Sequence, residues 1–431
     1  MAQRHRWLRQ EIERWRAAGL IDQALAATLA ARYPPPQAGR AWGQLIFSVI
    51  GAGIAGLGII LFFAYNWEAL PKAAKLGLVF VSLIAAHGAG IWTGARADGP
   101  RHLSEALHVL GTMLFGAGIW LVAQIYHIDG HYPDGLFVWS LGALALAWAL
   151  QSATQGLLAV ALIALWVGLE IFEFEWSLPW APLLVAAGVL PLAWLVRSRV
   201  LLFFGLLVLV VVMLVAAVPH DAELGIAAAF FTGVFYLLAS YELRRTAFPE
   251  AAPVCRLLGA AIYLIFLFVF SFAASIDVLD EIKIDDPLAV LYFAVPLALA
   301  LLASGYVVFA SWPDHDKLQR AHLTAVSASL LLTAFAVLGV AEFIAVPAAV
   351  AFNLIFLSHC GLYILQGLRD ADVKLISLAC VMLSALALAR FADLFDSLLV
   401  RSAVFVLLGA VLFAIGHFYF RSRRRTTESG P

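Results

Sequence analysis

The sequence predicts an all-α protein: a polytopic integral membrane helical bundle of about 14 transmembrane helices (12–14) with both termini cytoplasmic. Three observations predict it. Apolar residues fill 63% of the 431 positions and the mean hydropathy is +0.94, which is more apolar surface than one soluble core buries. These residues gather in long runs. Lysine and arginine lie between the runs, mostly on one side of an alternating pattern.

The apolar runs follow one another from Gly43 onward and measure roughly 16 to 24 residues each. Such a length crosses, or nearly crosses, a hydrocarbon core of about 30 Å as a helix. A helix also satisfies every backbone amide within its own segment, as lipid requires. The predicted spans are 43–65, 75–94, 103–126, 135–150, 155–172, 179–196, 200–218, 224–241, 257–277, 287–310, 322–341, 343–365, 375–391 and 398–420.

The basic residues predict the orientation, because cytoplasmic loops retain lysine and arginine. With the N-terminus inside, 22 of the 27 basic residues fall on the cytoplasmic side. The five outside are Lys72, Lys75, Lys283, Arg390 and Arg401. An odd number of helices would destroy this asymmetry, so we expect an even number.

Residues 1–42 precede the first span and predict a cytoplasmic amphipathic helical hairpin with a proline-rich linker. Apolar residues recur at helical spacing, Gly19 ends the first helix, and Asp22 caps a second helix that stops before Pro34. The hairpin is expected to dock a cytoplasmic protein partner, to lie on the membrane surface, or to form a solvated lid. The basic tail, 421–431, reads as a topological anchor, and no nucleic-acid binding is expected.

Residues 43–150 form a four-helix membrane unit that carries the motifs, and 151–420 supply further membrane helices. A shift of 60 residues indicates a tandem hairpin repeat in helices 1–4. Glycines at such spacings let helix backbones approach closely in lipid. The shift aligns Gly51, Gly56, Gly58, Ile59 and Leu61 with Gly111, Gly116, Gly118, Ile119 and Leu121.

Two polar clusters end the repeated helices at the extracytoplasmic face. If helices one and three touch through their glycine faces, the clusters form one ligand-binding pocket. Alternatively, the aromatic residues mark the membrane interface and the polar ones cap helix ends. The cluster residues are Asn66, Trp67 and Glu68, and Gln124, Tyr126, His127 and Asp129.

Three ionisable residues lie at the opposite end of helices two and three: His87, Glu105 and His108. Ionisable groups at membrane depth suggest function, and these three predict a proton relay. A locally paired cluster that joins the two hairpins is the alternative. The Glu105-x-x-His108 spacing is half of a di-iron motif, but no second copy occurs, so no metal and no other cofactor is expected.

Two stretches of the sequence carry a family resemblance. The first runs from Gly58-Ile59-Ile60-Leu61 through Asn66-Trp67 and Leu70-Pro71 to Lys75-Leu76. The second runs from Ser104-Glu105-Ala106-Leu107 through Gly116-Ala117-Gly118 to Ala123-Gln124-Ile125-Tyr126-His127-Ile128. Together with the turn Gly19-Leu20-Ile21, they resemble the bacterial predicted-membrane-protein family called domain-of-unknown-function family 2157, over the first ~150 residues. The resemblance implies a multi-pass protein of the bacterial inner membrane and carries no established activity.

The functional expectation rests on the repeated helices with polar ends, because transporters often place their sites between internal repeats. We expect binding or transport of a small ligand or lipid-like molecule through the extracytoplasmic pocket, with membrane lipid as a partner. The alternative is a non-transporting scaffold or sensor that acts through residues 1–42. No catalytic constellation is found, so enzyme activity is not expected.

Overall fold

The computed structural model describes residues 11–32, 70–96, 101–219, 222–272, 275–276, 287–337 and 341–394, with short pieces between 406 and 414. Within these ranges all regular structure is helical and no strand occurs. The chain divides into two compact units, Met1–Leu78 and Val79–Pro431. The predicted all-α class is therefore confirmed for the described residues.

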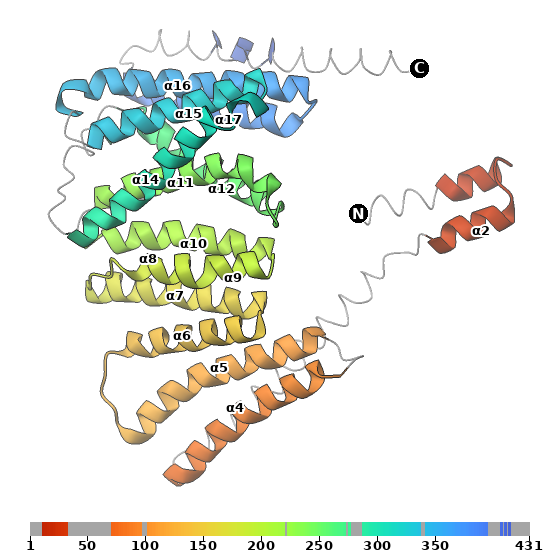
Figure 1. Cartoon of the computed structure of the whole chain (residues 1–431), viewed down its shortest axis with the longest axis vertical. Helices are drawn as coiled ribbons and strands as arrows, with labels where there is room; N and C mark the ends of the chain where they lie inside the picture. Colours follow the sequence, from red (N-terminus) through yellow and green to blue (C-terminus); the bar gives the residue numbers. More distant parts are fainter. Residues whose placement is uncertain are drawn as a thin grey trace. The chain divides into compact units, whose positions relative to one another are not determined.

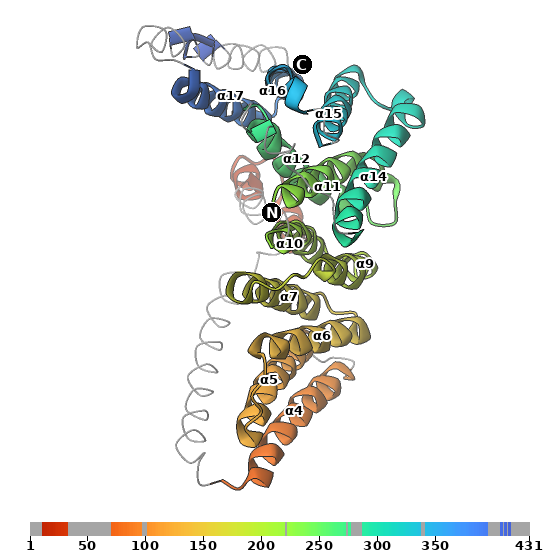
Figure 2. The same ribbon diagram turned by 90° about the vertical axis from the view of Figure 1, so that its left-hand side faces the viewer.

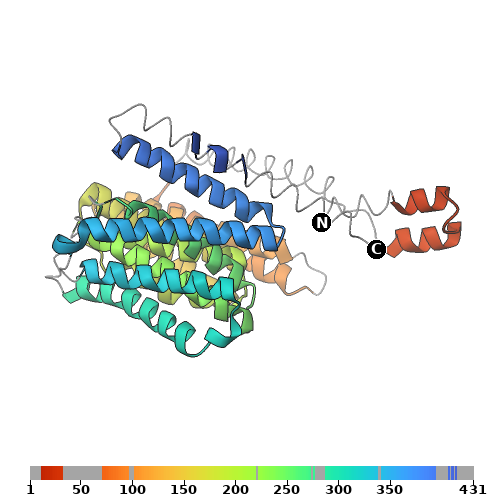
Figure 3. The ribbon, with the colours of Figure 1, turned by 90° about the horizontal axis from the view of Figure 1, so that it is seen from above.

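The first unit contains a short helical hairpin, drawn in red in Figure 3. Residues 11–17 are helical, Gly19 turns the chain at a φ of 69°, and α2 spans Gln23–Arg32. The Asp22 carboxylate accepts a hydrogen bond of 2.7 Å from the Leu25 amide, which caps α2. Ile12 and Ala26 are buried. The predicted stop at Gly19 and cap at Asp22 are both found.

The second unit is a stack of helices whose connections alternate between two ends (Figure 1). The first of them, α4, begins in the first unit. The helices are α4 (Lys72–Gly94), α5 (Arg101–Tyr126), α6 (Tyr132–Leu150), α7 (Ala153–Phe174), α8 (Ala181–Leu183), η1 (Leu184–Val189), α9 (Leu190–Leu195), α10 (Arg199–Ala217), α11 (Ala222–Glu242), η2 (Leu243–Arg245), α12 (Ala251–Val269), α14 (Pro287–Phe309), η3 (Trp312–Asp314), α15 (Lys317–Phe335), α16 (Ala341–Arg369) and α17 (Val373–Leu394).

Nine helices of the described part are long and apolar enough to cross a membrane, and two shorter apolar stretches cover Ala181–Leu195 and Phe293–Phe309. Each predicted span from 75–94 to 375–391 coincides with a described helix or helix series. The first span, 43–65, lies outside the described residues, and 398–420 is described only in short pieces. A polytopic helical membrane protein is therefore found, whereas the number of 14 and the orientation stay predictions.

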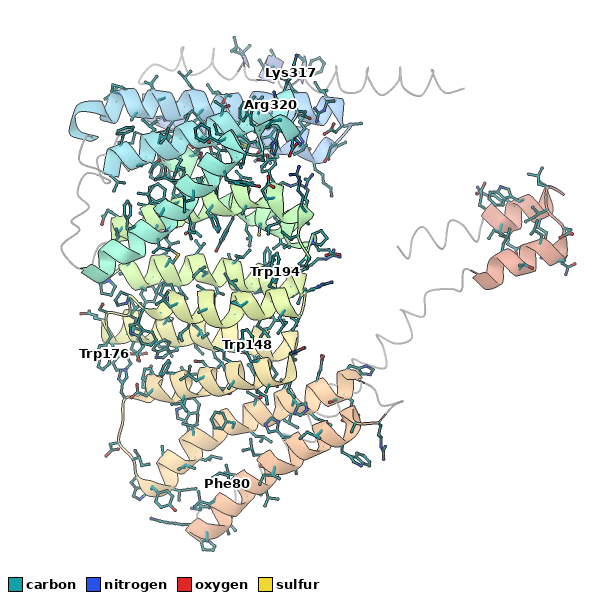
Figure 4. All side chains as sticks on the ribbon, viewed as in Figure 1. Phe80, Trp148, Trp176, Trp194, Lys317 and Arg320 are labelled. Carbon is teal, nitrogen blue, oxygen red and sulfur yellow. The ribbon has the colours of Figure 1, made fainter. Side chains whose placement is uncertain are left out.

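The two ends of the stack differ in chemistry. Residues 127–134 and 173–180 form what we call the carboxylate end. The opposite, arginine-rich end carries Arg199, Arg244, Arg256, Lys317 and Arg369. Exposed tryptophans occur toward both ends: Trp176 on one side and Trp148 and Trp194 on the other (Figure 4). Tryptophan favours the membrane–water interface, so this placement suits a spanning bundle.

Helix α11 occupies the middle of the second unit. It contacts α10, α12, α14 and α15, and its stacking on α10 is visible in Figure 2. Ala228 and Ala229 belong to a core cluster shared with α7 and α10, whereas Phe230 and Phe231 belong to a second cluster shared with α12 and α16. A helix that is apolar all around is typical of such a central position.

One predicted span is interrupted in the structure. Residues 179–196 form α8, the π-helical turn η1 and α9, because Pro191 lacks an amide hydrogen and its ring displaces the carbonyl four residues earlier. A side chain of another helix contacts this turn: Trp148 Nε1 donates to the Gly188 carbonyl at 2.7 Å. The tryptophan thereby ties α6 to the π-helical turn.

Candidate functional site

The predicted extracytoplasmic pocket is only partly within the described residues. Asn66, Trp67 and Glu68 lie outside them. The other predicted members, Gln124, Tyr126, His127 and Asp129, are all exposed at the end of α5 and in the loop that follows it. His127 has a φ of 55°, and its Nδ1 lies 3.0 Å from the Gln124 carbonyl, a contact that closes the helix end.

The structure brings together two of the three residues predicted as a proton relay. His87 on α4 and His108 on α5 face each other with an Nδ1–Nδ1 distance of 3.1 Å. Glu105 is exposed on α5, and Thr154 of α7 donates a hydrogen bond of 3.2 Å to its carboxylate. No hydrogen bond joins Glu105 to either histidine within the described ranges.

Glycines create the room for this first histidine pair. A Cβ at Gly90 would lie 2.9 Å from the His108 ring, and one at Gly111 would lie 2.5 Å from His87 Nε2. Gly116, also in the predicted glycine stripe, opposes Trp139 of α6 instead. The glycines of α5 thus make room for side chains of α4 on one side and of α6 on the other. The predicted repeat and the contact of helices one and three stay predictions, because residues 43–65 lie outside the described residues.

A larger site lies at the arginine-rich end. A cavity of about 830 Å³ opens between α11, α12, α15, α16 and α17. Most of its wall is apolar and comes from leucine, alanine and valine side chains of α12, α15 and α17. The apolar lining residues are Leu237, Pro253, Leu257, Ala260, Ala261, Leu264, Leu323, Val326, Leu375 and Leu378.

Basic side chains surround the opening of the cavity. Arg244, Arg256, Arg369 and Lys374 all line it and are all exposed. Arg369 forms ion pairs with Asp316 at 2.8 Å and with Asp370 at 2.9 Å. Within the described ranges no carboxylate forms an ion pair with Arg244, Arg256 or Lys374. Asp370 and Asp372 also line the cavity, so its opening has four basic and two acidic side chains and a positive net charge.

The carboxylates near the opening are already engaged. Asp316 caps α15, and the Gln319 amide that donates to it at 2.8 Å, together with Arg369, holds the pKa of this carboxyl below its usual value. Arg369 likewise lowers the pKa of Asp370. The Asp372 carboxylate accepts from the Lys374 amide at 2.9 Å and caps α17. None of the three forms an ion pair with Arg244 or Arg256 among the described residues.

A second histidine pair forms the inner wall. His322 on α15 and His359 on α16 stack, with an Nδ1–Nδ1 distance of 3.1 Å. His359 Nε2 lies 2.8 Å from the hydroxyl of Tyr263, to which Ser329 donates at 3.2 Å. His322 is only 7% exposed, yet its Nε2 has no hydrogen-bond partner among the described residues. A buried polar atom without a partner is costly, and this one belongs to a cavity-lining residue.

The hydrogen-bond chain that joins Ser329, Tyr263, His359 and His322 can have its hydrogens arranged in two consistent ways, one the reverse of the other. If Tyr263 donates to His359 Nε2, then His359 Nδ1 donates to His322, and His322 Nε2 carries a hydrogen. If the direction reverses, Tyr263 donates to Ser329 and His322 Nε2 becomes an acceptor. The atom that lacks a partner thus offers a donor or an acceptor without any charged imidazole.

Sequence reasoning missed this site. Arg244, Arg256 and Lys374 were recognised only as basic loop residues, and His322 was not singled out. A histidine within an apolar run is a signal, but the partner of His322 on α16 is 37 residues away. The face of α15 that meets α16 is set by packing, which a helical period alone does not reveal.

These features define a polytopic helical membrane protein with a basic-rimmed apolar cavity. Residues 13–156 match the family described as "Predicted membrane protein (DUF2157)". The resemblance expected from the sequence is thereby confirmed over that region. No curated protein matches the chain, and no solved structure matches it.

Proposed function

We propose that the protein binds an anionic amphiphile in the cavity at the arginine-rich end. The headgroup lies at Arg244, Arg256 and Lys374, and the apolar tail lies against α12 and α17. The single observation that carries the proposal is a mainly apolar cavity at whose opening three exposed basic residues, Arg244, Arg256 and Lys374, form no ion pair with a described carboxylate. Basic pockets between transmembrane helices are known sites for anionic lipid headgroups.

The walls support a ligand with a tail over a simple inorganic anion. Leu257 of α12 and Leu378 of α17 line the cavity and are 63% and 39% exposed. Apolar side chains at the opening contribute affinity only when a ligand covers them, because burial of apolar surface supplies the free energy. An acyl chain or another long apolar group fits this requirement.

The inner wall of the cavity favours a ligand with a polar group that reaches His322. This group is either part of the headgroup or a polar group at the end of the ligand that lies deepest in the cavity. A ligand oxygen near His322 Nε2 would satisfy the donor left without a partner in one direction of the hydrogen-bond chain. A charge-assisted hydrogen bond of this kind contributes about 1.5 to 3 kcal/mol when formed away from water. His322 therefore adds selectivity for an acceptor group in the ligand.

The distribution of basic residues favours a bacterial inner membrane protein with both termini and the arginine-rich end in the cytoplasm. Anionic lipids give the cytoplasmic leaflet a negative surface potential, so the ligand would be abundant beside the cavity. The extracytoplasmic pocket around Gln124 and His127 is a separate proposal that the cavity neither requires nor excludes.

The test uses the purified full chain in detergent with phosphatidylglycerol as the anionic probe and phosphatidylcholine as the matched zwitterionic lipid. Phosphatidylglycerol should bind and raise the thermal midpoint, and phosphatidylcholine should not. The double variant Arg244→Gln with Arg256→Gln should weaken binding about 30-fold, since each basic group near the headgroup contributes about 1 kcal/mol.

The matched control removes two other basic residues of the same end, Arg199→Gln with Lys317→Gln, which do not line the cavity. Lys317 is labelled in Figure 4. The control changes the net charge equally, so it should bind phosphatidylglycerol as the wild type does. Equal weakening in both double variants would show a general surface-charge effect and contradict the proposal.

A scaffold or sensor function of the N-terminal hairpin is the second proposal. Leu20 and Leu25 are 73% and 49% exposed in the first unit, and such apolar side chains suit contact with a partner helix. Deleting residues 1–42 should then leave phosphatidylglycerol binding intact and remove a co-purifying cytoplasmic protein. An unchanged set of co-purifying proteins would reject this second proposal.

A further inference from the structure

Three side chains able to bind a metal meet at the carboxylate end. His131 directly precedes α6, Asp134 lies in the first turn of α6, and Glu170 lies in the last turn of α7. Their candidate ligand atoms all lie within 4.8 Å of one another. Imidazole nitrogen and carboxylate oxygen are the ligands that zinc and related divalent ions accept.

Glu170 is held in place by two N–H groups. It is only 2% exposed, although it lies on a predominantly apolar helix. Trp166 Nε1 donates to Oε1 at 3.0 Å, and His131 Nε2 lies 2.6 Å from Oε2. A carboxylate buried in a membrane helix is costly unless it is paired, so its presence here indicates a purpose beyond packing. The bond from Trp166 is the kind of outer contact that orients metal-ligating carboxylates.

His131 is oriented by aromatic rings. Its imidazole stacks on Trp176 at a centroid distance of 4.7 Å and meets Phe174 edge-on at 4.3 Å. Glu175 adopts a left-handed conformation with a φ of 56°, and the Trp176 amide bonds the Glu170 carbonyl at 3.1 Å. This turn brings Trp176, which is labelled in Figure 4, back over the histidine. The ring plane is thereby fixed with Nε2 toward Glu170.

Asp134 supplies the third group from the aqueous side. Its amide bonds the His131 carbonyl at 3.0 Å, which forms the first turn of α6 and sets the two side chains on one face. The side chain is exposed. A purely structural hydrogen bond between His131 and Glu170 would not require this second carboxylate. Asp134 is therefore the residue that distinguishes a metal site from a structural hydrogen bond.

We propose that His131, Asp134 and Glu170 bind one divalent transition-metal ion, such as Zn²⁺, that enters from the aqueous side. Three protein ligands leave a fourth position for water. The hydrogen on His131 Nε2 now bridges to Glu170. When the ion takes its place, the neutral ring exchanges this hydrogen through solvent for one on Nδ1, so that Nε2 is free to bind the metal and the imidazole stays neutral. The ion would join the start of α6 to the end of α7.

The experiment measures Zn²⁺ binding to the full-length protein in detergent after chelator treatment and dialysis. We expect one Zn²⁺ per chain and a higher thermal midpoint with the ion than in chelator. Asp134→Asn should weaken binding by at least about tenfold, the smallest loss typical even of an outer-shell partner. His131→Gln should do the same.

The controls change a neighbouring carboxylate and an unrelated histidine. Glu173→Gln removes the charge of the carboxylate that accepts from the Tyr132 hydroxyl, and His102→Gln changes an exposed histidine of α5. Both should bind Zn²⁺ as the wild type does. Because Asp134 is exposed, Asp134→Asn should unfold at the wild-type temperature in chelator, and it decides the matter if His131→Gln does not fold.

Two results would overturn the metal site. One is the absence of saturable Zn²⁺ binding by the wild type. The other is wild-type affinity in Asp134→Asn. Cobalt substitution adds an independent readout, because the visible absorption of bound Co²⁺ reports nitrogen and oxygen ligation and should vanish with Asp134→Asn.

Discussion

Two histidine pairs in this chain have the same geometry and different surroundings. His87 with His108, and His322 with His359, each have an Nδ1–Nδ1 distance of 3.1 Å. The first pair packs against glycines of α4 and α5. The second lies at the wall of a cavity, with its outer nitrogen lacking a partner among the described residues. Thus, the same contact fits helix packing in one place and ligand binding in the other.

The difference between the pairs depends on what faces the second nitrogen of each ring. For His87 it is the backbone of Gly111, which leaves no room for a ligand. For His322 the second nitrogen is buried without a partner among the described residues, and the residue lines the cavity that Arg244 and Arg256 also line. A histidine pair in an apolar bundle therefore acquires a binding role only when unfilled space and complementary charge accompany it.

The largest expected effect is a difference in how much an alanine substitution beside each histidine pair destabilises the protein. Gly111→Ala should destabilise the protein by about 1 to 3 kcal/mol, because the new Cβ would lie 2.5 Å from His87 Nε2 and force α4 and α5 apart. Gly361→Ala is the matched change near the second pair, where no atom lies within 4 Å. It should be neutral or stabilising, and thermal unfolding in detergent checks both. Equal destabilisation by the two changes would remove the contrast.

A smaller effect separates the pairs by ligand binding. His322→Phe removes the unpartnered nitrogen and should weaken phosphatidylglycerol binding about tenfold, the value of one hydrogen bond to a charged group. His322→Gln retains a donor and should recover part of the affinity. His87→Phe should not change the affinity, which native mass spectrometry measures. Loss of binding in His87→Phe would show that the first pair also contributes to the site.

The smallest effect concerns Asp316, which links α15 to Arg369 beside the second pair. Asp316→Ala should cost about 1 kcal/mol at pH 7, as loss of an N-cap does, and Asp316→Asn should cost less because asparagine also caps. Because the folded pKa of Asp316 lies below the ordinary value of about 3.9, the carboxylate stabilises the protein above that pH. This contribution is lost as the pH falls through the lowered pKa.

Thermal midpoints measured over a series of pH values check in which direction the contribution of Asp316 to stability changes with pH. The wild type should lose its advantage over Asp316→Asn between about pH 4 and more acidic values, where the carboxylate takes up a proton. An advantage that grows on acidification would contradict the assigned ion pair with Arg369. The first histidine pair has no such carboxylate hydrogen-bonded to it, so His87→Phe should leave this pH dependence unchanged.

The sequence was sufficient to predict where the helices lie in the chain, but not which faces of the helices pack against one another. Long apolar runs predicted every described helix from α4 to α17, because lipid requires the chain to bond within each segment. The π-helical turn before Pro191 was not expected. The proline was visible, but how the chain bonds around it depends on Trp148 from another helix.

The same limit explains which site residues were found. His87 and His108 are 21 residues apart in one hairpin, so their predicted depth in the membrane was enough to place them together. Tyr263 and His359 are 96 residues apart, and His131 and Glu170 are 39 apart. Their meeting depends on which helix faces pack. Helical periodicity does not determine this in a bundle whose helices are apolar nearly all around.

Native mass spectrometry of the full chain, with equal amounts of phosphatidylglycerol and phosphatidylcholine, tests directly whether the cavity binds the anionic lipid. It compares the wild type with Ala261→Phe, which adds a bulky ring to the cavity wall and keeps every basic residue, and with Ile265→Phe, one turn further along α12 and not among the residues that line the cavity. We predict selective phosphatidylglycerol binding by the wild type and Ile265→Phe and its loss in Ala261→Phe. Undiminished binding by Ala261→Phe would show that the cavity does not hold the lipid.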